Sequence, residues 1–168
     1  MHANRTILVL APGALAAAVL LAGCGSTKSK AASPHVLRYL AVDQSGTAIG
    51  FGDKRPPRVG DRFMFTNALY KPGARPDTPS GKPVGHGEAL CTFTAPRLGK
   101  FFCSGTIHLA GGYIAIFNDV RGNERLNTGV VVGGVGAYAN ARGTTEFTVL
   151  KRTREGQETS AIVVRLTP

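Results

Sequence analysis

The stretch GDRFMFTNALY, residues 60–70, contains the residue best placed to do chemistry, Asn67. In a β-strand the side chains alternate between two faces, so one face of this stretch would carry Phe63, Phe65, Asn67 and Leu69. A buried carboxamide among apolar neighbours needs partners for two donors and one acceptor. We predict that these four residues line a ligand pocket in which Asn67 meets a ligand or an ordered water. The alternative is an asparagine that a neighbouring strand satisfies at a bulge.

A second group of reactive side chains lies in GHGEALC, which contains His86, Glu88 and Cys91. The H-x-E pattern is found in zinc deaminases, but their P-C-x-x-C partner motif is missing from this sequence. Serine hydrolase and phosphate-loop motifs are missing too. His108 shares an alternating face with Thr106 and is typical of a surface or rim histidine. We therefore expect neither a metal nor a cofactor.

The glycine-rich segment 129–143 contains Gly134, Gly136 and Ala139 in the GxGxxA spacing of dinucleotide-binding sites. That site requires a helix after the glycines and an acidic residue after a second strand. Here TTEFTVLKR follows almost at once and has the pattern of another strand. A tight turn or bulge at a barrel corner is the better interpretation. The glycines assigned to it are Gly133, Gly134, Gly136 and Gly143.

The N-terminus has the layout of an export signal, with Arg5 before an apolar run that is too short and broken for a membrane span. The run ends in LAGC, which resembles the bacterial lipobox, in which the signal is cut before a lipid-bearing cysteine, here Cys24. An ordinary cleaved signal is the alternative. We predict a lipoprotein signal peptide over 1–23, a flexible tether over 24–34 and one folded domain over 35–168.

Cysteine usage agrees with export, because Cys91 and Cys103 remain as an even pair once Cys24 is assigned to lipid. If the segments around them form a hairpin that turns at residues 96–98, position 91 falls opposite position 103. Opposed positions in a hairpin are close enough for a disulfide. The alternative is two buried free thiols.

The net charge is +10, and cleavage before Cys24 would remove Arg5 and leave +9. The arginines are scattered along the sequence, and no basic-aromatic nucleic-acid motif is present. We expect no nucleic-acid partner. An exported basic protein meets anionic lipid headgroups and envelope polymers, although a solvated basic surface also explains the charge.

Strand patterns dominate the predicted domain, with glycine and proline between most of them and no convincing amphipathic helix. Their number and spacing suit a closed antiparallel barrel or a sandwich. The predicted strands are 36–43, 61–70, 84–95, 100–109, 112–120, 128–133, 144–153 and 159–167.

Four motifs in order resemble the allene oxide cyclase-like barrels: GD at 60–61, FTNALY at 65–70, VGHGEALC at 84–91 and VVGGVGAYANARG at 131–143. The last also resembles a segment of plant dirigent proteins. The resemblance implies an all-β fold, an eight-stranded antiparallel barrel with an apolar internal pocket, and the possibility of a homo-oligomer. It also implies that Asn67 corresponds to the cyclase asparagine that holds a water beside the substrate oxygen, and Cys91 to a pocket cysteine.

Two departures separate the chain from the plant cyclases. Their first-strand acidic residue falls near Leu40 and their pocket tyrosine near Val120, so allene oxide cyclisation does not carry over. Asp43, Asp61, Glu88 and Asp119 are the candidate pocket or rim carboxylates.

We therefore expect an exported, membrane-anchored barrel that binds a small apolar ligand, lipid-like or phenolic. Its activity would be to guide a cyclisation, an isomerisation or a stereoselective coupling. The alternative is a non-catalytic cell-envelope interaction lipoprotein with a filled barrel and a basic surface.

Overall fold

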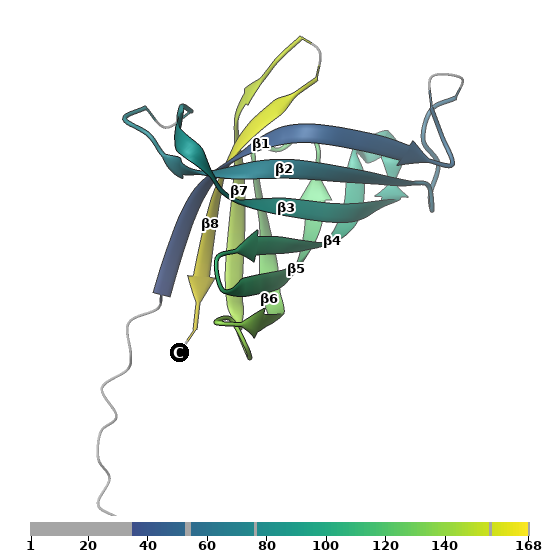
Figure 1. Cartoon of the computed structure of the whole chain (residues 1–168). Coiled ribbons are helices and arrows are strands. Elements are labelled where there is room, and N and C mark those ends of the chain that lie inside the picture. Colours follow the sequence, from purple (N-terminus) through teal and green to yellow (C-terminus); the bar gives the residue numbers. More distant parts are fainter. Residues whose placement is uncertain (1–34, 53–54, 76, 155, 168) are drawn as a thin grey trace, which may run out of the picture. The chain divides into compact units, whose positions relative to one another are not determined.

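The computed structural model describes residues 35–52, 55–75, 77–154 and 156–167. Eight antiparallel strands form a closed barrel in which each strand pairs with its neighbours in sequence and β8 pairs back with β1 (Figure 1). The predicted eight-stranded barrel is confirmed. The elements are β1 (His35–Ile49), β2 (Arg62–Pro72), β3 (Pro79–Ala95), the 3₁₀ turn η1 (Pro96–Leu98), β4 (Lys100–Leu109), β5 (Gly112–Arg121), β6 (Leu126–Gly136), β7 (Gly143–Arg152) and β8 (Glu158–Leu166).

The predicted signal peptide, the tether and Cys24 lie outside the described residues. All strand pairings of the barrel close within residues 35–166, and the described residues form one compact unit. Within the part of the chain that the structure describes, no helix is long and apolar enough to cross a membrane.

Side-chain alternation explains why these segments become strands of a barrel. In β5, Ile114 and Ile116 are buried, whereas Phe117 is 42% exposed on the outer wall. Burying one face of each strand supplies most of the driving force for closure, because apolar area removed from water contributes about 25 cal/mol per Å². The interior cluster consists of Ala41, Leu69, Ile107, Ile114, Ile116, Val131, Ile162 and Val164.

The two ends of the barrel differ in their loops and their filling. The end that we call the cavity end carries the loops 50–61, 96–99, 122–125 and 153–157, and the packed end carries the loops 73–78, 110–111 and 137–142. Leu109, Tyr138 and Leu166 pack against the interior cluster near the packed end.

A bulge in β1 determines the shape of the cavity end. The pairing of β1 with β8 stops at Val42, but its pairing with β2 continues to Ile49, with a register shift between Asp43 and Ser45. The strand is therefore longer than the predicted 36–43. The sequence Gln44-Ser45-Gly46 is typical of a turn, but hydrogen bonding to β2 overrides that local preference. As a result, β1 leaves β8 at Asp43.

Candidate functional site

A cavity of about 280 Å³ lies inside the barrel, and all eight strands contribute to its wall. Its volume falls just below the range of about 300 to 1,000 Å³ that is usual for ligand sites. The aromatic residues of the wall are Phe63, Phe65, Phe101 and Phe147. The polar and charged residues of the wall include Asp43, Asn67, Asn118, Asn127 and Glu158.

Phenylalanines form a continuous cluster at the cavity end. The ring of Phe63 lies 5.1 Å from Phe101, 5.4 Å from Phe93 and 6.2 Å from Phe65, measured between centroids. Phe51, from the loop after β1, packs edge-on against Phe93 at 5.4 Å. Such contacts fix the rings and give the cavity a rigid apolar wall.

Asn67 on β2 projects into the cavity, and its side chain is 8% exposed. It lies over Gly87 on β3, where a Cβ atom would come within 2.5 Å of Asn67 Oδ1. Gly87 is therefore needed to leave room for the carboxamide. Asn67 Oδ1 is buried without a hydrogen-bond partner among the described residues. The structure thus does not favour the alternative in which a neighbouring strand satisfies this side chain, and the unmet acceptor lies against Gly87, on a residue that lines the cavity.

Asn118 on β5 repeats this arrangement. It is 5% exposed, and its carboxamide lies over Gly129 on β6, where a Cβ atom would come within 2.6 Å of Nδ2. Asn118 is not among the residues predicted from the sequence, although its alternation with Ile114 and Ile116 is the same signal that identifies Asn67. The cavity therefore has two carboxamides, each opposite a glycine.

Asn127, the third asparagine of the wall, has a structural role. Its Oδ1 accepts a hydrogen bond from the backbone N–H of Arg121 at 2.8 Å, and its Nδ2 donates to the carbonyl of Glu124 at 3.4 Å. These bonds fasten the turn between β5 and β6. Asn127 is 9% exposed, which makes it a close counterpart of Asn67 with its hydrogen bonds made.

Two carboxylates, Asp43 and Glu158, meet at the point where β1 leaves β8. Asp43 Oδ2 accepts a hydrogen bond from the backbone N–H of Glu158 at 3.1 Å. Burial raises the pKa of Asp43, and the charge of Glu158 raises it further, against the opposing effects of that hydrogen bond and of Arg152. Glu158 is tied at 2.6 Å to Arg152 Nη2 and at 2.7 Å to Ser160 Oγ. Glu158 is thus ion-paired with Arg152, whereas Asp43 is the carboxyl group whose neutral form is favoured by burial.

The raised pKa of Asp43 predicts how this group affects stability. The folded protein binds the Asp43 proton more tightly than the unfolded chain does, so stability from this group is present at low pH and lost as pH rises through the folded pKa. Asp43→Asn keeps an acceptor for the Glu158 N–H and should remove this loss. Denaturant unfolding from pH 4 to 7, compared between the two proteins, measures the difference.

Asp61 provides a control, because its pKa is shifted in the opposite direction from that of Asp43. Its carboxylate accepts two hydrogen bonds from Arg55, at 2.6 and 2.9 Å, and these hold its pKa below the usual value. Asp61→Asn should therefore remove stability that the native protein loses as pH falls. If both variants shift the pH profile in the same direction, the assignment for Asp43 is wrong.

The structure separates the four residues predicted to line a pocket. Phe63, Phe65 and Asn67 line the cavity, whereas Leu69 is fully buried in the interior cluster and does not. Leu69 lies nearer to the packed end, where side chains fill the barrel. Alternation along the strand therefore predicts correctly that Leu69 faces the interior, but it does not predict how far the cavity extends along the barrel.

The predicted disulfide between Cys91 and Cys103 is confirmed. The two residues are direct partners in the hairpin of β3 and β4. Cys103 lines the cavity and Cys91 is fully buried, so neither offers a thiol to a ligand.

At the two departures from the plant cyclases, the chain has apolar side chains. Val120 lines the cavity. Leu40 is 1% exposed and is not one of the cavity-lining residues. Of the four candidate carboxylates, Asp43 and Glu88 are among the cavity-lining residues; Asp43 is half-buried, whereas Glu88 is exposed.

The glycine-rich segment forms β6 and the loop to β7. Gly133 and Gly134 follow a register shift against β5, and Gly136, the last residue of β6, has a positive φ of 66°. A Cβ atom at Gly134 would come within 2.3 Å of the Tyr138 carbonyl oxygen. The loop leads into Gly143, the first residue of β7, so a strand rather than a helix follows the glycines.

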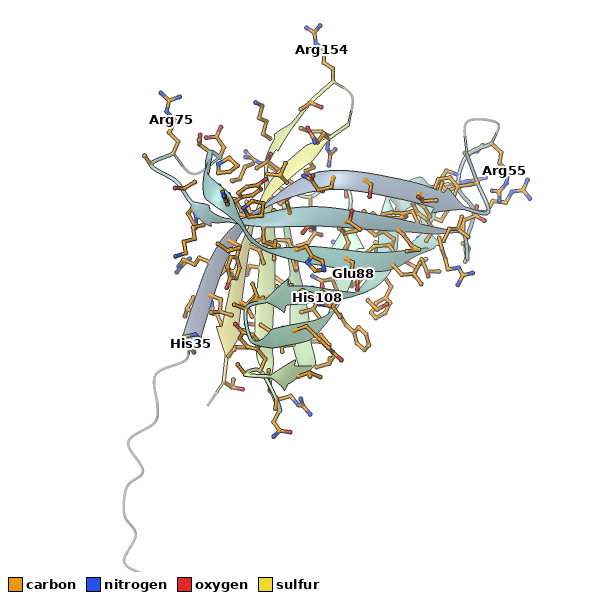
Figure 2. All side chains as sticks on the ribbon, in the orientation of Figure 1. His35, Arg55, Arg75, Glu88, His108 and Arg154 are labelled. Atoms are coloured by element: carbon orange, nitrogen blue, oxygen red, sulfur yellow. A yellow bond between two sulfur atoms is a disulfide. The ribbon has the colours of Figure 1, made fainter. Side chains whose placement is uncertain are left out.

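His86, Glu88 and His108 form a cluster on β3 and β4, in which Figure 2 labels Glu88 and His108. Glu88 Oε1 lies 3.2 Å from His108 Nε2, and the His86 ring stacks on His108 at 4.5 Å. The Glu88 carboxylate is 56% exposed and turns to solvent. Among the described residues, no group of three or more potential ligands is arranged to hold a metal ion.

Solved structures with the same fold include three proteins of known activity. A pyocyanin demethylase is 25% identical to this chain, with a TM-score of 0.61 over 79% of this chain and 100% of that one. A pterocarpan synthase dirigent protein is 15% identical, with a TM-score of 0.67 over 82% and 97% of the two chains. An exo-specific intermolecular Diels-Alderase is 15% identical, with a TM-score of 0.56 over 79% and 98%.

These likenesses establish a dirigent-like, eight-stranded antiparallel barrel, the fold that the sequence motifs imply. No protein-family model matches the sequence, and no curated protein is similar to it in sequence.

Proposed function

We propose that this protein binds a small, mainly apolar ligand inside the barrel and holds a polar group of that ligand against Asn67. The observation that carries the proposal is Asn67, a buried carboxamide whose Oδ1 has no partner among the described residues, in the wall of a cavity that phenylalanines also line. Such an acceptor is costly to bury unless a ligand or a water meets it. A barrel filled by its own side chains, as the non-catalytic alternative requires, would leave no such space.

The chemistry that we propose for this site is conformational restraint combined with proton exchange. The rigid aromatic wall would hold a reactive ligand in one conformation, while Asn67 and Asn118 polarise an oxygen or nitrogen atom. Asp43 would deliver or accept the proton. The names of the similar structures, a demethylase, a pterocarpan synthase and a Diels-Alderase, support a small organic substrate of this kind.

A polarity-sensitive neutral dye, N-phenyl-1-naphthylamine, tests the cavity. The dye should fluoresce more strongly when it enters the native barrel, and Ala89→Leu, which places a larger side chain in the cavity wall, should reduce its affinity by about tenfold or more. Ala115→Leu is the matched control, because Ala115 lies on the outer wall of β5. Equal affinity of the Ala89 and Ala115 variants, or no dye binding by the native protein, would contradict the proposal.

We also propose that the protein is anchored by lipid on Cys24 at the extracytoplasmic face of a membrane. The support is the LAGC motif and the polar segment that follows it. The intact mass of protein isolated from its native membrane tests this: an N-terminal acylated cysteine is expected, and cleavage elsewhere without acyl mass would refute it.

A further inference from the structure

The loops of the cavity end carry a repeated pair of residues. Arg58–Val59, Arg97–Leu98 and Arg125–Leu126 each place an arginine directly before an exposed aliphatic side chain. Val59 is 71% exposed, Leu98 62% and Leu126 51%. Exposed aliphatic residues are common singly, but one at each of three loops on the same end of a barrel is a pattern that needs a cause.

Antiparallel connectivity brings these three pairs to one end. They lie in or next to the loops 50–61, 96–99 and 122–125, which follow β1, β3 and β5. Backbone hydrogen bonds hold these loops in place: Gly60 N of the first loop donates to Phe93 O near the end of β3, and Gly122 N of the third loop donates to Gly99 O of the second, both at 2.9 Å. Figure 2 shows Arg55 of the first loop at the opposite end of β1 from His35.

Three arginines of these loops have no acidic partner among the described residues and leave the surface positively charged. Among the described residues of the first and third loops, the acidic side chains are Asp61 and Glu124, and both are ion-paired, Asp61 with Arg55 at 2.6 Å and Glu124 with Arg121 at 2.9 Å. Arg58, Arg97 and Arg125 have no ion-pair partner among the described residues. The cavity reaches the same end, because Phe63, Phe101 and Val120 on its wall each lie one residue inside a strand terminus.

We infer that these three loops are a membrane-docking surface, which inserts Val59, Leu98 and Leu126 into an anionic lipid bilayer while the adjacent arginines bind the headgroups. Aliphatic side chains gain free energy at the boundary of headgroups and acyl chains, and arginines gain it at an anionic surface. Docking in this orientation turns the cavity towards the lipid. The inference does not depend on which ligand the cavity binds.

Other occupants fit these loops less well. Nucleic acid would use the arginines but gain nothing from the aliphatic side chains, since single strands stack on aromatic ones. A second copy that presents the same loops would bring arginine against arginine. An anionic bilayer can interact with both residues of each pair, with the arginine through its headgroups and with the aliphatic side chain at the boundary of headgroups and acyl chains.

The barrel segment 32–168, which contains every strand pairing, tests the inference without any contribution from a lipid anchor. It should bind vesicles of phosphatidylcholine and phosphatidylglycerol, and bind them less as salt rises, with little binding to phosphatidylcholine alone. Leu98→Ser combined with Leu126→Ser should weaken binding by about tenfold or more. Val36→Ser combined with Val135→Ser, on exposed residues near the packed end, should change it by less than about twofold.

The chain contains no tryptophan, so an introduced one reports its own position. In Leu98→Trp the emission should shift to the blue on anionic vesicles and be quenched by brominated lipid, whereas in Val36→Trp neither change should occur. Arg97→Glu should weaken binding, and Arg75→Glu, on the β2–β3 loop at the other end, should not do so to the same extent. Equal effects at both ends, absence of vesicle binding, or binding to an oligonucleotide but not to vesicles would overturn the inference.

Discussion

Replacing Cys91 and Cys103 together with alanine is expected to lower the free energy of unfolding by about 3 kcal/mol. The bond closes a ring across a separation of 12 residues, and a ring of this length removes conformational entropy from the unfolded chain. Because Cys103 lines the cavity, the change should also alter the cavity wall. Denaturant unfolding measures the loss.

The native protein under reducing conditions is the control for that experiment. Reduction breaks the same cross-link without removing the sulfur atoms from the core, so it should reproduce most of the loss. An unchanged unfolding midpoint in the double variant would show that the bond contributes nothing to stability. A loss in the variant that reduction does not reproduce would assign the effect to packing instead.

Asn67→Leu is expected to leave the stability unchanged or raise it by about 1 kcal/mol, while ligand binding falls. The side chain has similar branching, and the change removes an acceptor that has no partner among the described residues. A ligand group that meets Asn67 in the native protein would lose a hydrogen bond, which costs about tenfold in affinity. Unfolding and ligand titration of the same variant measure the two effects separately.

Asn127→Leu is the matched control, because Asn127 is buried to the same degree but has both ends of its carboxamide hydrogen-bonded. Its removal leaves the Arg121 N–H unpaired and should cost about 1 to 3 kcal/mol. If Asn67→Leu destabilises a correctly folded protein as much as Asn127→Leu does, Asn67 has a structural role and the proposed binding role is wrong.

The sequence predicts the features of this barrel that depend on local alternation. The inward face of β2, the strand number and the opposition of Cys91 and Cys103 all follow from a period of two and a short turn. The extension of β1 beyond Asp43 does not follow, because pairing with β2 stabilises residues that favour a turn on their own.

The charged part of the site depends on distant pairings and could not be predicted. Glu158 reaches Asp43 only because β8 closes on β1, and neither residue lies in a motif that identifies the other. The three arginine–aliphatic pairs are likewise scattered in the sequence, and the barrel topology brings them to one end. Depth inside the barrel, which separates Leu69 from Asn67, is a property of the packed fold and not of the strand pattern.

The pairing of β1 with β8 also determines at what stage of synthesis the barrel can close. Seven of its eight pairings join strands that are consecutive in the chain, so these hairpins can form as the chain emerges. The remaining edge of β1, from His35 to Val42, has no partner until residues 159–166, the last strand, have been made. The first strand to leave the ribosome is therefore the last to be fully paired, and until then its exposed edge needs protection from other chains.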